Sequence, residues 1–366
     1  MTVYRPFRNV TSTAREQEAI SLRLAAQTSD HADVAGRSFP DAVAALRRLT
    51  DDDLGRVNEA ILDTMRSPVA LIPDIAGHLV HAGGKRIRPM LTLASARLFG
   101  YRGDDHVKLA AAVELIHGAT LLHDDVVDAS ALRRGEDTAN VIWGNKESVL
   151  VGDFIFSRAF ELMVGARDLK VLQIISSASG VIAEGEVLQL ATQKNLAATV
   201  DMYLAVIEAK TAALFAAAAQ AGAAIAGCCE ADEAAMRRFG LNLGIAYQLI
   251  DDALDYSGLE AALGKRVGDD FREGKMTLPI VYALARASDE ETAFWRRTIA
   301  EGRQQPDDLA AARAILEANG ALADTIACAG RYADLALEAL DEVDAPGAEY
   351  AAALADLAAA SARRAF

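Results

Sequence analysis

The sequence has little cysteine, little proline and a deficit of basic residues. Cys228, Cys229 and Cys328 are too few for a disulfide scaffold and have no zinc-binding spacing, so we expect a reducing compartment. Only 8 prolines interrupt 366 residues, and apolar runs of period two are rare, which disfavours a β protein. The formal charge of -15 argues against a nucleic-acid-binding protein, which needs a basic face. A hydrophobic fraction of 52% excludes wholesale disorder.

Two segments resemble targeting or membrane signals. Residues 1–15 carry arginines and no acidic residue, as a transit peptide does, but Glu16 and Glu18 follow and there is no secretory apolar core. We therefore expect a cytoplasmic protein of bacterial type, with an organellar matrix as the alternative. Residues 211–229 are uncharged and long enough to span a bilayer, yet they are mostly Ala and Gly, which contribute little transfer energy. We expect a buried core helix and no membrane span.

Long stretches rich in Ala and Leu predict helix nearly throughout the chain. The predicted helices are residues 105–128, 146–164, 171–192, 200–227, 230–256 and 276–286. Several are apolar around most of their circumference, which is typical of helices buried in a large bundle. Residues 1–40 are more polar and predict an N-terminal extension, and no later break resembles a linker. We therefore predict a single all-helical domain over residues 41–366.

A five-residue aspartate pattern occurs twice in apolar helical surroundings. Its members are Asp124, Asp125 and Asp128 in the first copy, and Asp251, Asp252 and Asp255 in the second. On a helix, positions i and i+4 share a face, so the first and last aspartate of each copy point together. Such carboxylates repel one another unless a cation lies between them. A solvated acidic face is the structural alternative, but the flanking residues are Leu, Ile, Val and Ala, so the repeat predicts a catalytic metal site.

The ligand type indicates which metal would bind. Carboxylates without cysteine or convergent histidine select hard cations, here two or three Mg²⁺ ions held by Asp124, Asp128, Asp251 and Asp255. Magnesium bridges carboxylates to substrate phosphates, so two such clusters would surround one diphosphate. The chemistry indicated is ionisation of a carbon–oxygen bond with diphosphate as the leaving group.

Basic and polar residues recur beside the two aspartate motifs. His117 shares a helical stripe with Asp124, and Gln248 precedes Asp252 by one turn, although either side chain could be an ordinary core residue. The candidate cations and neighbours are Lys85, Arg88, Arg133, Arg134, Lys210, Thr211, Lys265 and Lys275. Surface lysine and arginine are common, but their repeated proximity to the motifs favours a second, cation-held diphosphate.

Taken together, these motifs resemble the trans-polyprenyl diphosphate synthases, the head-to-tail isoprenyl elongases. The resemblance covers about residues 69–284 and is greatest to bacterial long-chain octaprenyl and decaprenyl synthases. It depends on residues 83–89 (GGKRIRP), Glu114 with His117, the two aspartate motifs, Arg133-Arg134-Gly135, Lys210-Thr211, and residues 264–279. The family implies an all-α isoprenoid synthase fold around a deep apolar cavity, commonly as a homodimer.

The resemblance also implies residue roles. Asp124 and Asp128 would ligate magnesium with Asp125 in support, and Asp251, with Asp255, would bind a further ion. Isopentenyl diphosphate would be held by Lys85, Arg88, His117 and Arg134. The allylic diphosphate would be held by Arg133, Lys210, Thr211, Gln248 and Lys265. The double bond of isopentenyl diphosphate would then attack the allylic cation, with proton loss to the released diphosphate.

Two other functions are weighed against this one. A class I terpene cyclase shares the fold, but cyclases usually place Asn or Asp, Ser or Thr, and Glu at helical spacing in the second motif. Here those positions are Asp251, Asp255 and Leu259. A non-catalytic bundle that binds diphosphate lipids would not need a second cationic site. Neither alternative explains Gly-Gly-Lys-Arg and Arg-Arg-Gly together.

The positions before the first aspartate motif bear on product length. Ile116, Ala119 and Thr120 lie one to two turns upstream, where short-chain family members place a bulky aromatic residue. Ala119 and Thr120 are small, so the floor of the expected elongated apolar tunnel should lie deeper, around Leu172. The expected product is a chain of about eight to ten isoprene units, of the length used in ubiquinone-type side chains, with peripheral release at a membrane.

Overall fold

The computed structural model describes residues 37–81, 83–257 and 267–364. The chain divides into two compact units, Met1–Gly36 and Arg37–Phe366, and only the second contains described residues. Helix α2 begins at Phe39, where the Ser38 side chain accepts a hydrogen bond from the Asp41 backbone and Pro40 occupies the first turn. Phe39 and Pro40, which the sequence grouped with the extension, therefore belong to this helix.

The described unit is almost entirely helical, which confirms the predicted fold class. In chain order its elements are α2 (Phe39–Thr64), α3 (Leu71–His81), α4 (Ile87–Leu98), α5 (Asp105–Val127), β1 (Leu132–Arg133), β2 (Glu136–Asp137), α6 (Ala139–Ile142), α7 (Asn145–Gly165), α8 (Leu169–Thr192), α9 (Val200–Ile207), the π-helical turn η1 (Glu208–Ala212), α10 (Ala213–Ile225), α11 (Glu230–Ser257), α13 (Asp269–Glu273), α14 (Leu278–Leu284), α15 (Asp289–Trp295), the π-helical turn η2 (Arg296–Ala300), α16 (Asp308–Ala318), α17 (Ala321–Asp341) and α18 (Ala348–Ser361).

The long predicted helices form close to their expected bounds. The main difference is the segment 200–227, which is one helical stretch in three parts because the π-helical turn η1 separates α9 from α10. Residues 276–286 form a shorter helix than predicted, α14, because Thr277 is its N-cap and Pro279 lies in its first turn. Among the described residues, the one pair of strands, β1 and β2, is a hairpin in which Arg133 opposes Glu136.

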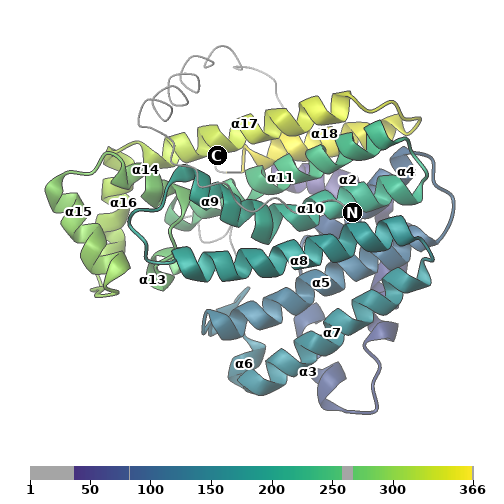
Figure 1. Cartoon of the computed structure of the whole chain (residues 1–366), viewed down its shortest axis with the longest axis horizontal. Helices are drawn as coiled ribbons and strands as arrows, with labels where there is room; N and C mark the ends of the chain where they lie inside the picture. Colours follow the sequence, from purple (N-terminus) through teal and green to yellow (C-terminus); the bar gives the residue numbers. More distant parts are fainter. Residues whose placement is uncertain (1–36, 82, 258–266, 365–366) are drawn as a thin grey trace, which may run out of the picture. The chain divides into compact units, whose positions relative to one another are not determined.

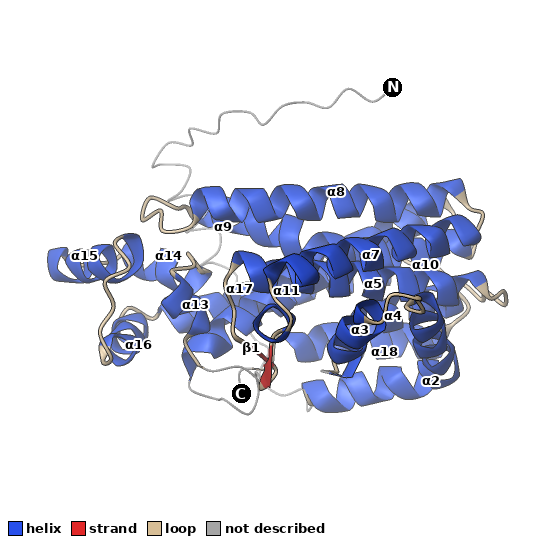
Figure 2. Ribbon diagram, turned by 90° about the horizontal axis from the view of Figure 1, so that it is seen from below, coloured by secondary structure: helices blue, strands red, loops and turns tan. Residues whose placement is uncertain are grey.

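The core lies around α5, α10 and α11, which other helices cover on several sides (Figure 1). Helix α10 contacts α4, α5, α8 and α11, and nine of its 13 residues are buried. Its abundant alanines let these backbones approach closely, as the composition predicted. Helices α14, α15 and α16 form a smaller group at one end, where Trp295 is fully buried (Figure 2).

Two helical stretches, α8 and the continuous segment Val200–Ile225, are long and apolar enough to cross a bilayer by length and composition. Buried helices of a protein core meet the same criterion. Of the apolar window in Val200–Ile225, 56% is buried inside the molecule, which agrees with the core helix expected there.

Candidate active site

Both aspartate motifs line one cavity of about 560 Å³. The first motif lies at the C-terminal end of α5, where Asp128 caps the helix, and the second lies in the last two turns of α11. Apolar residues of the lining include Leu121, Val206 and Phe215. Two distant helix ends thus deliver their carboxylates to one space, as the repeated pattern predicted.

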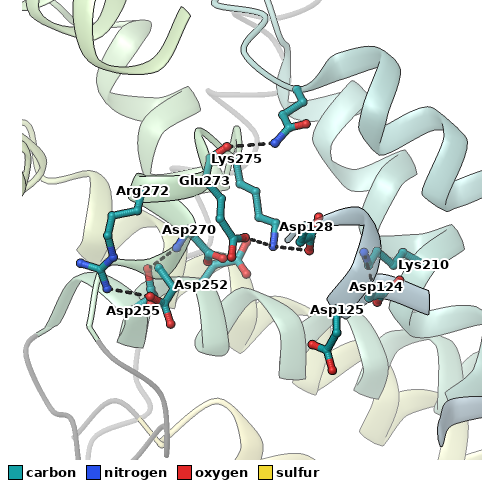
Figure 3. Close-up of polar contacts among 12 residues, drawn as sticks. Asp124, Asp125, Asp128, Lys210, Asp252, Asp255, Asp270, Arg272, Glu273 and Lys275 are labelled. Carbon is teal, nitrogen blue, oxygen red and sulfur yellow. Dashed lines mark hydrogen bonds and ion pairs between the residues drawn. The ribbon is translucent and has the colours of Figure 1, made fainter. Parts of the chain in front are cut away.

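In the first motif, Asp124 and Asp128 line the cavity and Asp125 does not. The Lys210 ammonium lies 3.5 Å from Asp124, and the Lys275 ammonium donates to Asp128 at 3.1 Å (Figure 3). Asp125 is 3% exposed and accepts three hydrogen bonds from the Arg133 guanidinium, at 2.9, 3.2 and 2.7 Å. Burial raises the pKa of Asp125, and Arg133 opposes that shift. The middle aspartate therefore holds an arginine in place.

In the second motif, each aspartate has a different partner. Asp251 lies 2.9 Å from the guanidinium of Arg364. Asp252 is buried and accepts bonds from the Tyr203 hydroxyl at 2.6 Å and the Gln248 amide at 2.7 Å. Burial raises the pKa of Asp252 well above its usual value.

The last aspartate of this motif organises the loop that follows α11. Asp255 accepts hydrogen bonds from the backbone N–H groups of Gly268 at 3.2 Å and Asp270 at 3.1 Å. The carboxylate therefore holds the start of α13 against α11. Since Asp270 also lines the cavity, this contact brings a further carboxylate to the site.

The donor set fits magnesium. Asp124, Asp128 and Asp251 each pair with a side-chain cation, so these carboxylates already occupy places where positive charge is stabilised. Among the described residues, no group of three or more His, Cys, Asp or Glu side chains is arranged to hold a metal by itself. A cation bound here would draw its remaining ligands from water and substrate phosphate, which is the usual coordination of Mg²⁺.

A basic wall lines the same cavity. It consists of Lys85, Arg86, Arg88, Arg133, Arg134 and Arg364. Three of these cations lie over aromatic rings: Lys85 over Phe39 at 5.3 Å, Arg88 over Phe215 at 4.5 Å, and Arg364 over Phe39 at 4.4 Å and Tyr247 at 4.6 Å. Burial lowers the pKa of both Lys85 and Arg88, which shows that water solvates their charges poorly. In such surroundings an anion placed against them interacts more strongly than it would in water.

Backbone geometry presents Arg134 to the cavity. Arg134 occupies the loop between β1 and β2 with φ of 56°, a left-handed conformation uncommon for residues other than glycine. Its guanidinium lies against Gly84, where a Cβ would come within 3.1 Å of Nη1. The second glycine of the GGKRIRP motif, Gly84, thus leaves room for an arginine from the hairpin. Nearby, His117 lines the cavity, and burial together with the surrounding arginines lowers its pKa well below 6.5, which favours the neutral imidazole.

Lys210 and Thr211 lie on the π-helical turn η1, and both line the cavity. Lys210 donates to Glu186 at 2.6 Å, and the Thr211 hydroxyl donates to the Gln248 amide oxygen at 2.9 Å. Lys275 also contacts Glu273, and its pKa is raised by the carboxylates around it, with burial opposing the shift. Lys265 lies outside the described residues.

The residues expected to control chain length separate into two groups. Thr120 lines the cavity. Ile116 and Ala119 are fully buried in the main apolar core, and half-buried Leu172 packs against that core; none of the three belongs to the cavity lining. The expected floor at Leu172 is therefore not part of this cavity, because Leu172 packs against the main apolar core instead.

Several residues of the site were missed by sequence reasoning. Glu186, Tyr203, Tyr247 and Arg364 all line the cavity. Glu186 lies outside every motif that the sequence displayed, and Arg364 follows an alanine-rich helix with no pattern that marks it. Tyr247 lies one turn before Asp251 on α11, so helical spacing could have indicated it. Nothing local distinguishes Glu186, Tyr203 or Arg364, because only the packing of distant helices brings them to the aspartates.

A family model described as polyprenyl synthetase matches residues 69–316. The chain belongs to the polyprenyl synthetase family. It is 46% identical over 314 residues to octaprenyl diphosphate synthase of Escherichia coli, covering 86% of this chain and 97% of that protein. Among solved structures, a Caulobacter crescentus polyprenyl synthase complexed with calcium and isoprenyl diphosphate has a TM-score of 0.86 and 51% identity, covering 90% and 99% of the two chains.

A decaprenyl diphosphate synthase from Rhodobacter capsulatus is similar as well, with a TM-score of 0.84, 49% identity, and coverage of 88% of this chain and 99% of that one. This polyprenyl synthetase is a long-chain trans-prenyltransferase, and the all-α isoprenoid synthase fold is confirmed. The similarity favours neither the terpene cyclase nor the non-catalytic binder.

Proposed function

We propose that this chain adds isopentenyl diphosphate repeatedly to an allylic diphosphate, giving an all-trans product of octaprenyl to decaprenyl length. The observation that carries the proposal is one cavity with two kinds of anion-binding surface: paired carboxylates that suit Mg²⁺, and the basic wall. Two chemically distinct places for diphosphate match a reaction that joins two diphosphate substrates.

The proposed roles follow from these positions. The allylic diphosphate lies between the aspartate motifs, close to Lys210 and Lys275, and isopentenyl diphosphate lies against Lys85, Arg88 and Arg134. When bound, magnesium supplies positive charge that stabilises the departing diphosphate. Lys210 and Lys275 add positive charge beside the same leaving group, through side chains already held at Asp124 and Asp128.

The bond changes are as follows. The carbon–oxygen bond of the allylic substrate breaks, and diphosphate leaves with the electron pair. The double bond of isopentenyl diphosphate then forms the new carbon–carbon bond, and a proton passes to the released diphosphate. Leu121, Val206 and Phe215 keep water from the cation, which it would otherwise quench.

Two observations support a long product. Relatives of high identity are named octaprenyl and decaprenyl diphosphate synthases. The cavity-lining residue one turn before Asp124 is Thr120, which is too small to stop a growing chain. Such a product suits the side chain of a ubiquinone-type quinone, released peripherally at a membrane by a cytoplasmic enzyme.

The test is incubation of the protein with radiolabelled isopentenyl diphosphate, an allylic primer and Mg²⁺, with products separated by chain length. Chains of about eight to ten units support the proposal. A short product contradicts the assigned length, a cyclic hydrocarbon indicates a cyclase, and absence of incorporation indicates a binding protein.

We also propose a homodimer that forms through α6, α7 and α8. Exposed large apolar side chains gather on these elements: Val141, Ile142, Val149, Leu150, Val164, Leu169, Val181, Val187 and Leu190. Scattered exposed apolar residues are ordinary, but concentration on neighbouring helices is typical of an interface. Sedimentation of Leu150→Glu is expected to show a monomer where the parent is a dimer. A parent that sediments as a monomer would contradict the interface.

A further inference from the structure

The turn that carries Lys210 and Thr211 departs from α-helical geometry. Residues Glu208–Ala212 form a π-helical turn between α9 and α10, within one helical stretch. A π turn bonds each N–H to a carbonyl five residues back, so it is wider than an α turn and consecutive side chains diverge by less than about 100°. Both Lys210 and Thr211 therefore point into the same cavity, although they are adjacent in sequence.

Two glycines from different helices contact this turn. Gly185 of α8 is buried, and a Cβ at this position would lie 2.8 Å from both the Ala209 Cβ and the Lys210 backbone nitrogen. Gly244 of α11 lies against the end of the turn, where a Cβ would come within 2.7 Å of the Ala212 Cα. In both cases part of the obstacle is backbone, which cannot rotate away.

Each glycine lies close in sequence to the polar partner of one side chain on the turn. Glu186, directly after Gly185, accepts the bond from Lys210. Gln248, one turn after Gly244, accepts the bond from Thr211. The distance between α8 and the turn therefore determines whether Lys210 can reach Glu186, and the distance between α11 and the turn determines whether Thr211 can reach Gln248.

We infer that Gly185 and Gly244 are positioning residues, which let α8 and α11 approach the π turn closely enough to aim Lys210 at the first aspartate motif and Thr211 at Gln248. The inference rests on the proposed function, which places both side chains at the allylic diphosphate. Ordinary carbon contacts begin at about 3.5 Å, so a methyl group at either position would push the turn by several tenths of an ångström. A misplacement of about 1 Å at a reacting centre can lower a rate about a hundredfold.

The test compares Gly185→Ala and Gly244→Ala with Gly180→Ala and Gly330→Ala, at which a Cβ would meet no atom within 4 Å. Gly180 lies on the same helix as Gly185. We expect turnover to fall about tenfold to a hundredfold in the first pair and to remain near the parent value in the second pair. Melting curves are recorded for all four, and turnover is measured well below each Tm.

A double-mutant cycle separates positioning from general destabilisation. If Gly185 acts through Lys210, Gly185→Ala should cause little further loss in a Lys210→Ala background, and Gly244→Ala should behave likewise with Thr211→Val. Equal losses in both backgrounds, or turnover within about twofold of the parent, would overturn the inference. If Gly185→Ala does not fold, the double variant Gly185→Ala with Ala209→Gly is used instead. It removes the contact with the Ala209 Cβ and leaves the contact with the Lys210 backbone nitrogen. If the double variant Gly185→Ala with Ala209→Gly recovers no turnover, that result would also contradict the positioning inference.

The proposed function has a separate outcome in the same experiment. If Lys210→Ala and Thr211→Val both keep full turnover, the assignment of these side chains to the allylic site is wrong. If they lose turnover while Gly185→Ala and Gly244→Ala do not, only the positioning inference is wrong.

Discussion

The guanidinium of Arg364 lies 2.9 Å from the carboxylate of Asp251, between the rings of Phe39 and Tyr247 at 4.4 and 4.6 Å. Its side chain is only 5% exposed. Asp251 is a predicted metal ligand beside the diphosphate site, so Arg364 places positive charge close to the expected position of the substrate phosphates. Lys85 also lies over the Phe39 ring, at 5.3 Å, so Arg364 and Lys85 are neighbours in the basic wall.

We therefore expect Arg364→Gln to raise the KM for isopentenyl diphosphate by about tenfold, the scale of one lost charged hydrogen bond. The primer KM should change less. Arg363→Gln is the matched control, because Arg363 is the adjacent, exposed arginine. Equal behaviour of the two variants in steady-state kinetics would show that Arg364 has no part in substrate binding.

The aspartates that line the cavity should be essential for turnover. Asp124→Ala or Asp251→Ala is expected to leave a folded helical protein, judged by circular dichroism, and to lower turnover by about a hundredfold or more. Asp52→Ala on α2 is the control, since that carboxylate is exposed. Near-normal turnover in either cavity variant would remove that residue from the metal site.

The two diphosphate positions should respond to different substitutions. Arg88→Ala should raise the KM for isopentenyl diphosphate more than that for the primer, because Arg88 belongs to the basic wall. Lys210→Ala should raise the primer KM or lower turnover, because its ammonium lies beside Asp124. Parallel changes in both constants, measured with each substrate varied in turn, would contradict separate positions.

Thr120 and Ala119 are neighbours in sequence with different surroundings, so substitutions at the two positions should have different effects on product length and stability. Thr120→Phe places a ring in the cavity and should shorten the product while the first condensation continues. Ala119→Phe overpacks a fully buried position, which costs about 1–3 kcal/mol, and should lower Tm. Product analysis and melting curves check both. A stable Ala119→Phe enzyme that makes shortened product would reverse this assignment.

A buried histidine away from the cavity should make stability depend on pH. His106 is fully buried, and burial lowers its pKa below 6.5, with the 2.9 Å contact to Asp53 opposing the shift. The unfolded chain then binds more protons than the folded one as pH falls below 6.5, so stability decreases. His117, with its pKa lowered by burial, acts in the same direction.

We expect Tm to fall between about pH 7.5 and pH 5, and His106→Gln to reduce that fall. His78→Gln, at a histidine bonded to the Asp137 carbonyl near the surface, is the control. An unchanged slope of Tm against pH in His106→Gln would show that this imidazole does not titrate in the window.

Sequence alone determined the helical fold class, the bounds of most long helices and the pairing of two aspartate motifs. These features depend on spacing within one helix, where periodicity places Asp124 with Asp128 and Asp251 with Asp255 on common faces. The basic motifs were also readable, because Gly83, Gly84 and the cations that follow them lie together in the chain.

Only the tertiary structure decided which partner each side chain takes. Asp125 turns to Arg133, Arg364 reaches Asp251 from the end of the chain, and Thr120 enters the cavity while Ala119 does not. Nothing in the local sequence separates these outcomes, since ion pairs and burial depend on residues from other helices. The π turn at Lys210 has the same origin: its glycine neighbours, Gly185 and Gly244, belong to α8 and α11, and packing alone brings them to it.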